Sequence, residues 1–238
     1  MAKNAERSAE FKAGAAALDE RASLRGCQAA TLFARPPFVY FVPFVDSSSP
    51  LPFTAVLLAG GKSTRMGCDK AGVLIDGQPL WQRQLATLRA LDPAELFISG
   101  RSDGPYAGAG VPIVADEMPG CGPLGGLVTA LRRMQCERLL VLAIDLPAMT
   151  PEFLASLLGQ AARTGCGVLP ETGAGIEPLA AVYPRACLPL AEQSLANADR
   201  SVQRFVRLAH AQGLLSFRTT SAAEEPLFRN VNAPSDLP

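Results

Sequence analysis

The stretch from Leu58 to Lys70 combines residue types that bind polyphosphates. Gly60 and Gly61 allow a sharp turn in which backbone N–H groups approach a ligand closely. Arg65 and Lys70 add two positive charges to the same stretch. Together these groups predict a cradle for a triphosphate. Two glycines after a strand, taken alone, favour a simple turn with both cations in solvent, whereas the whole stretch favours the phosphate site.

This stretch does not fit the two common phosphate-binding motifs. Gly61-Lys62-Ser63 matches the end of a P-loop, but that motif needs a glycine five residues before Gly61, and Val56 stands there. The dinucleotide-binding fingerprint also fails, because no glycine triplet with its spacing links a strand to a helix. Any phosphate site here is therefore of another kind.

An acid marks the end of a strongly apolar run. Asp145 follows the apolar residues 139–144 and precedes Leu146 and Pro147. Because a carboxylate is costly to bury against a core, we expect it to face the mouth of the sheet. Magnesium is bound by one or two protein carboxylates with waters and substrate phosphates, so Asp145 is a candidate Mg²⁺ ligand. The residues leave open a second role, in which Asp145 only caps the turn before Pro147.

Short apolar runs alternate with helical periods after Pro52, and this pattern predicts the elements that position these groups. We expect strands at 54–58, 96–99, 111–115, 139–144, 179–183, 214–218 and 228–231, and helices at 79–91, 124–134, 185–196 and 200–211. A further helix begins at Thr150-Pro151-Glu152, with an N-cap, a first-turn proline and an acid near the positive helix end. The alternation is typical of a three-layer α/β fold, with a mostly parallel central sheet and helices on both faces. Ligands bind at the carboxyl ends of the strands in such folds, where Leu58 and Asp145 are expected.

Composition restricts the function further. The chain has 238 residues, 48% of them hydrophobic, which suits a domain with a substantial core and excludes a wholly disordered chain. Twenty-two Lys and Arg balance 22 Asp and Glu, so the chain is not expected to bind nucleic acid through net charge. Six cysteines without a C-x-x-C pair and a single histidine argue against a usual zinc site. Reduced thiols in a cytoplasmic protein fit this pattern best.

Residues 1–50 differ from the rest of the chain. We expect them to form an N-terminal extension that is poorly ordered or weakly helical, followed by one domain at 51–238. The most apolar run, 32–45, contains Arg35 and three prolines, so we expect no membrane-spanning segment.

The stretch 58–70 resembles the signature loop of the MobA-like nucleotidyltransferases, with the pattern L-A-G-G-x-S-x-R-M-G-x-D-K. Further segments are similar to the family in the same order: Asp76 to Leu80, Gly122 to Gly126, Asp145 to Pro147, Glu177 to Tyr183, Asp199-Arg200 and Asn230 to Pro234. The resemblance covers about residues 52–238. It implies a Rossmann-like nucleotidyltransferase domain at 51–238.

The resemblance also implies roles for individual residues. The implied catalytic residues are Arg65, Lys70 and Asp145, with Asp145 as the ligand of a Mg²⁺ cofactor. The implied nucleotide-binding residues are Leu58, Ala59, Gly60, Gly61, Lys70, Asp116 and Asp145. The implied acceptor-binding residues are Gly122, Gly126, Arg200, Asn230 and Asn232. The two asparagines alternate along a predicted strand and would therefore share a face.

The reaction implied by the resemblance is the transfer of GMP from GTP to the phosphate of molybdenum-loaded molybdopterin, with release of pyrophosphate. GTP and molybdopterin would be the small-molecule substrates. Molybdoenzyme chaperones or other cofactor-biosynthesis proteins would be protein partners, and neither nucleic acid nor a membrane is expected. No side chain needs to act as a covalent nucleophile.

Three alternatives stay open at this point. Family members that use GTP typically carry an asparagine after the second strand, whereas this chain has Ile98-Ser99-Gly100-Arg101 there, so guanine and cytosine are both possible bases. A cytidylyltransferase of molybdopterin, or an enzyme acting on a sugar or polyol phosphate, would share the glycine-rich loop and the acid after the strand. A relative that binds a nucleotide without catalysis is a third option, which the joint presence of Arg65, Lys70 and Asp145 argues against.

Overall fold

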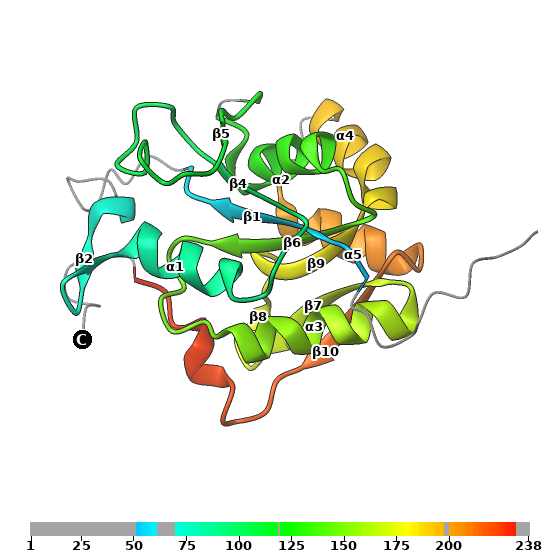
Figure 1. Cartoon of the computed structure of the whole chain (residues 1–238). Helices are drawn as coiled ribbons and strands as arrows, with labels where there is room; N and C mark the ends of the chain where they lie inside the picture. Colours follow the sequence, from blue (N-terminus) through cyan, green and yellow to red (C-terminus); the bar gives the residue numbers. More distant parts are fainter. Residues whose placement is uncertain (1–50, 61–69, 119, 198–199, 232–238) are drawn as a thin grey trace, which may run out of the picture. The chain divides into compact units, whose positions relative to one another are not determined.

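A strand of five buried residues, β1 (Thr54–Leu58), lies inside the central sheet. The computed structural model describes residues 51–60, 70–118, 120–197 and 200–231 (Figure 1). The expected extension at 1–50 lies outside these residues, as do three predicted site residues, Gly61, Arg65 and Asn232.

Strands and helices alternate along the described chain. The remaining strands are β2 (Leu74–Ile75), β3 (Gln78–Pro79), β4 (Glu95–Ser99), β5 (Ile113–Val114), β6 (Arg138–Ala143), β7 (Gly167–Thr172), β8 (Gly175–Ile176), β9 (Ala180–Pro184) and β10 (Leu215–Thr219). The α-helices are α1 (Leu80–Arg89), α2 (Gly122–Arg133), α3 (Pro151–Thr164), α4 (Leu188–Ala196) and α5 (Val202–Ala211). Three short 3₁₀ helices are η1 (Lys70–Gly72), η2 (Arg185–Cys187) and η3 (Glu225–Phe228). No helix in the described ranges has the length and apolarity needed to cross a membrane.

The main sheet has the order β10-β7-β9-β6-β1-β4-β5, with β8 paired to β7. Strand β1 is parallel to both of its neighbours, β4 and β6. The pairs β4–β5 and β7–β10 are also parallel, whereas β9 runs antiparallel to β6 and β7. The predicted mostly parallel sheet is thus confirmed, and the carboxyl ends of β1, β4 and β6 meet at one edge.

Helices cover both faces of the sheet because its interior strands are apolar on both sides. Ala55 and Leu57 of β1 belong to the core under α1 and α3, while Val56 and Leu58 belong to the core under α2, α4 and α5. Figure 1 shows these two sets of helices on opposite faces. Helix α3 begins as predicted, with the Thr150 side chain accepting a hydrogen bond from the Phe153 N–H. The predicted three-layer α/β fold is confirmed.

Two expectations near the end of the chain were wrong. The strand expected at 228–231 is absent: η3 ends at Phe228, and irregular backbone follows to Val231. Phe228 instead packs edge-on against Phe153 of α3, with ring centroids 5.3 Å apart. The helix expected to begin at Arg200 begins at Val202, because Ser201 caps it by accepting a hydrogen bond from the Arg204 N–H.

Candidate active site

Lys70 and Asp145 meet at the carboxyl edge of the sheet. Lys70 opens η1, directly before the fully buried Ala71, while Asp145 follows β6 after one further residue. The Lys70 Nζ atom lies 3.6 Å from Asp145 Oδ2. Both side chains are partly open to solvent, with 21% and 27% of their surface exposed. The structure thus brings together two residues that are 75 positions apart and were both predicted to be catalytic.

Hydrogen bonds from three segments hold the backbone around Asp145. The Ile144 N–H donates to the Leu58 carbonyl at 3.1 Å, which joins the ends of β6 and β1. The Ala143 N–H donates to the Leu179 carbonyl at 2.7 Å. The Val231 N–H donates to the Asp145 carbonyl at 3.0 Å. These hydrogen bonds hold the backbone of Asp145 in place, while its side chain is partly exposed to solvent.

A second carboxylate contributes to the same negative field. Burial raises the pKa of Glu177, and the nearby charges of Asp145 and Glu225 raise it further. The backbone of Glu177 is fixed by its N–H, which donates to the Pro170 carbonyl at 2.9 Å. Carboxylates that repel one another at the mouth of a sheet favour a bound cation there.

The donor set around Asp145 fits a magnesium-type metal ion. Hard divalent cations prefer oxygen ligands, and magnesium commonly uses one or two carboxylates with phosphates and waters completing its shell. Within the described ranges, no three His, Cys, Asp or Glu side chains are close enough to form a metal centre by themselves.

The predicted nucleotide-binding residues of the first loop extend from the same edge. Leu58 and Ala59 are buried, and Gly60 is exposed. The Ala59 N–H donates to the Ser99 carbonyl at 2.8 Å, so the start of the loop is tied to the end of β4. The chain then enters the part of the glycine-rich loop that the structure does not describe.

Asp116, predicted on the nucleotide side, is held by the backbone that precedes α2 and by a side chain of that helix. Its Oδ1 atom accepts hydrogen bonds from the Met118 N–H at 2.9 Å and the Thr129 hydroxyl at 3.3 Å. Thr129 is fully buried in α2, so the carboxylate is oriented by the fold. A position after a strand is also typical of an acid that is surrounded by solvent. Asp116 is instead hydrogen-bonded to the fold.

The described residues among the predicted acceptor-binding set fall on three segments. Gly122 and Gly126 belong to α2, and Gly126 lies against the end of β1, since a Cβ added there would stand 3.7 Å from Leu58 Cδ2. Arg200 precedes α5, and its Nη1 donates to the Gly120 carbonyl at 3.0 Å, just before the start of α2. Asn230 is exposed on the third segment, next to the Val231 N–H that bonds to the Asp145 backbone.

Two residues of α1 that contact this site were not singled out from the sequence. Gln84 is fully buried, and its Nε2 donates to the carbonyls of Ala143 and Leu146, while Arg83 Nε donates to the Pro147 carbonyl at 3.0 Å. A signal for Gln84 was present, because it is a polar residue in the apolar stripe of α1, one turn after Leu80.

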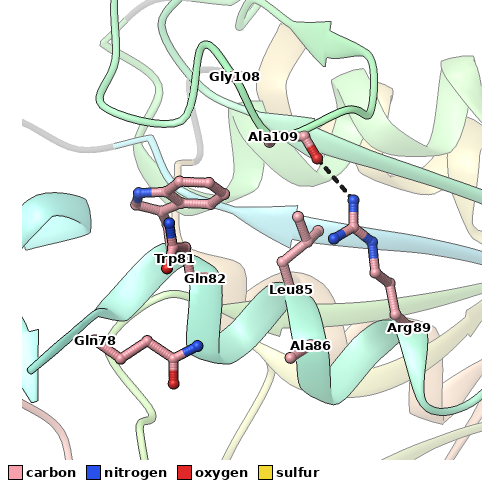
Figure 2. Close-up of a pocket in the computed structure, with 8 residues that line it drawn as sticks. All are labelled: Gln78, Trp81, Gln82, Leu85, Ala86, Arg89, Gly108 and Ala109. Carbon is pink, nitrogen blue, oxygen red and sulfur yellow. Dashed lines mark hydrogen bonds between the residues drawn. The ribbon is translucent and has the colours of Figure 1, made fainter. Parts of the chain in front are cut away.

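A cavity of about 300 Å³ lies between α1 and the loop that carries Gly108 and Ala109 (Figure 2). Its lining residues are Gln78, Trp81, Gln82, Leu85, Ala86, Arg89, Gly108 and Ala109. Arg89 Nη2 donates to the Ala109 carbonyl at 2.7 Å, which ties the end of α1 to the loop after β4. None of the eight is a predicted site residue and none is acidic, so this cavity lacks a carboxylate ligand for a metal-bound triphosphate.

A mostly parallel α/β sheet with a glycine-rich loop, a lysine and a strand-end acid at its carboxyl edge is typical of enzymes that act on nucleoside triphosphates. The family model of the MobA-like NTP transferase domain matches residues 55–214, so the chain belongs to this family. It is therefore a nucleotidyltransferase, and enzymes of this kind generally need a divalent metal.

Curated relatives agree with this assignment. A probable molybdenum cofactor guanylyltransferase of Opitutus terrae is 36% identical over 195 residues, which cover 80% of this chain and 95% of the relative. A protein of the same name from Pelotomaculum thermopropionicum is 34% identical, over 79% of this chain and 91% of the relative.

Solved structures show the same fold. Molybdopterin-guanine dinucleotide biosynthesis protein A from Archaeoglobus fulgidus superposes with a TM-score of 0.62 at 24% identity, over 77% of this chain and 94% of that one. The 2-C-methyl-D-erythritol 4-phosphate cytidylyltransferase from Thermus thermophilus gives 0.58 at 18% identity, over 78% and 95%. Because the second protein's name states another base and acceptor, the fold alone does not select a substrate.

Proposed function

We propose that this nucleotidyltransferase transfers GMP from GTP to the phosphate of molybdenum-loaded molybdopterin. The observation that carries the proposal is the juxtaposition of Lys70 and Asp145, 3.6 Å apart, at the edge of the sheet where such folds bind their ligands. The names of the curated relatives supply guanine and the molybdenum cofactor.

In this reaction an oxygen of the acceptor phosphate attacks the α-phosphorus of GTP. A new phosphoanhydride bond forms, the bond from the α-phosphorus to the bridging oxygen breaks, and pyrophosphate leaves with the electron pair. The acceptor phosphate is already ionised at neutral pH, so its attack needs no side chain as general base. The protein's main task is to orient two anions and to reduce their repulsion.

Each catalytic residue has a role in that task. Lys70 places a positive charge beside the phosphates, and Arg65 adds a second one from the glycine-rich loop. Asp145 would hold Mg²⁺ through its carboxylate, together with phosphate oxygens and water. When bound, the metal supplies Lewis-acid stabilisation of the charge that develops on the leaving group. Leu58, Ala59, Gly60 and Gly61 would provide backbone contacts to the nucleotide.

The binding sides of the two substrates are taken from the family resemblance. Asp116, oriented by α2, would contact the nucleotide, whereas Gly122, Gly126, Arg200, Asn230 and Asn232 would contact the acceptor. Since residues 98–101 offer no asparagine, guanine would be recognised through backbone groups or Asp116. Molybdoenzyme chaperones or other cofactor-biosynthesis proteins would receive the product in the cytoplasm.

The test is incubation of the purified full chain with Mg²⁺, molybdenum-loaded molybdopterin and either GTP or CTP. We expect GTP to yield equal amounts of pyrophosphate and the guanine dinucleotide, identified by mass spectrometry, and CTP to react far more slowly. The Asp145→Asn variant serves as the inactive control. A faster reaction with CTP would contradict the choice of base, and no product from either nucleotide would contradict the proposed acceptor.

A further inference from the structure

A buried amide in α1 is hydrogen-bonded to the turn that carries Asp145. Gln84 has no solvent-exposed surface. Its Nε2 atom donates to the Leu146 carbonyl at 2.6 Å and lies 3.3 Å from the Ala143 carbonyl. These two carbonyls flank Asp145 on either side in the chain. One side chain therefore bridges the end of β6 and the residue just after the acid.

The neighbouring residue of α1 supports the same turn from outside. Arg83 Nε donates to the Pro147 carbonyl at 3.0 Å, while its Nη1 lies 3.3 Å from Asp76 Oδ2. Asp76 belongs to the turn between β2 and β3, so Arg83 connects that turn to the segment after Asp145. Gln84 and Arg83 together bind carbonyl groups at three positions between Ala143 and Pro147.

Gln84 has a feature that packing alone does not explain. Its Oε1 atom is buried and accepts no hydrogen bond anywhere in the part of the chain that the structure describes. An unsatisfied buried acceptor destabilises the folded protein, and an apolar residue of similar size would fill the space without it. The Nε2 group, by contrast, donates to the Ala143 and Leu146 carbonyls, where the chain leaves the sheet near Asp145.

We propose that Gln84, assisted by Arg83, is a positioning residue that sets the direction of the Asp145 carboxylate for metal binding. This inference rests on the proposed role of Asp145 as the metal ligand. Without the Nε2 donor, the Ala143 and Leu146 carbonyls lose their side-chain partner and the turn can relax. The carboxylate then meets the metal–nucleotide complex in more than one orientation, which lowers the metal affinity.

The experiment measures the Mn²⁺ affinity of the full chain saturated with GTP, by electron paramagnetic resonance, for four variants. We expect Gln84→Met, which conserves volume, to raise the Kd for Mn²⁺ by roughly 10-fold or more. Arg83→Met removes only the outer support and should give a smaller rise. GTP affinity without metal should not change in either variant, which separates a loss of positioning from a general loss of structure.

Two further variants make the result decisive. Thr54→Val removes a buried hydroxyl at the opposite edge of the sheet, where Thr54 Oγ1 donates to Glu95 Oε2, and should lower stability without changing the Kd. Asp145→Asn should abolish Mn²⁺ binding. If Asp145→Asn leaves the Kd unchanged, the proposed function fails. If Asp145→Asn abolishes binding but Gln84→Met and Arg83→Met bind Mn²⁺ like the wild type, only the positioning role is overturned.

Discussion

The charged groups at the amino edge of the central sheet, where β1 and β4 begin, are paired differently from those at its carboxyl edge, where β1 and β6 end. At the amino edge of β1 and β4, Glu95 is paired on several sides: Arg133 Nη1 lies 2.9 Å from its Oε1, and the Gln135 N–H and the Thr54 hydroxyl donate to its Oε2 at 3.0 and 3.1 Å. Only 17% of the Glu95 side chain is exposed. The negative charge there is balanced within the fold, and it joins β1, β4 and the end of α2.

At the carboxyl edge, the contacts of the described charged groups are longer. Asp145 has Lys70 at 3.6 Å, which is longer than the contacts at Glu95, and Glu177 adds a charge of the same sign. This difference supports the proposal that similar residue types stabilise the fold at one edge and bind a ligand at the other. A substitution at the carboxyl edge should therefore change activity, and one at the amino edge should change stability.

The largest effect is expected from removal of the cation at the carboxyl edge. Lys70→Ala should lower kcat by about 10²–10³-fold, because a positioned charge beside the transferring phosphate is lost. Its unfolding midpoint should stay near that of the wild type, since a partly exposed ion pair contributes about 0–1 kcal/mol to stability. Steady-state pyrophosphate release and thermal unfolding measure the two quantities. If kcat falls and the unfolding midpoint falls clearly as well, Lys70 is a structural residue.

An intermediate effect, on stability alone, is expected at the amino edge. Glu95→Ala removes the acceptor of hydrogen bonds from Thr54 and Gln135 and the partner of Arg133. The free energy of unfolding should fall by about 1.5–3 kcal/mol, the range for hydrogen bonds to charged groups. Denaturant unfolding measures this loss, and kcat of the folded variant should equal that of the wild type. If kcat is lowered under conditions where the variant is fully folded, the amino edge also affects activity, and the proposed difference between the two edges is wrong.

The smallest effect concerns Glu177 and depends on pH. Its pKa in the folded protein is raised above 4.5, so the folded state holds the proton more tightly than the unfolded state. Stability is therefore lost as the pH rises through this raised pKa. Glu177→Gln should be slightly more stable than the wild type near neutral pH, and this difference should shrink below about pH 4.5. Thermal unfolding at several pH values checks the sign. A variant that is less stable at neutral pH would show that the ionised Glu177 is stabilising.

The sequence predicted helices and strands well where the local sequence signals all indicate the same element. The strand at 54–58 was predicted with its observed bounds, because four of its five residues are apolar and two glycines follow after Ala59. The helix start at Thr150 was also correct, since its cap, proline and acid all indicate the same boundary. The strand at 167–172 was not predicted, because Pro170 interrupts it and proline is uncommon inside a sheet.

The sequence could predict only those site residues whose charge and position after a strand indicate a role in binding. Lys70 and Asp145 could be paired in advance, because both follow strands whose carboxyl ends share an edge. Gln84 could not be placed beside Asp145, since its contacts with Ala143 and Leu146 depend on how α1 packs over β6. The expected strand at 228–231 failed for a similar reason, because the packing of Phe228 against Phe153 overrides the local apolar pattern.

Asp145 and Lys70 are proposed to bind a metal-bearing triphosphate together. The most direct test is a crystal structure of the full chain with GTP and Mn²⁺, with anomalous scattering used to locate the metal. We expect an anomalous peak at coordination distance from an Asp145 carboxylate oxygen, with Lys70 Nζ in contact with a phosphate of the same nucleotide. A metal bound at Asp116 or Glu177 with Asp145 turned away, or a nucleotide bound in the cavity between α1 and the Gly108–Ala109 loop, would show that Asp145 and Lys70 do not form the triphosphate site.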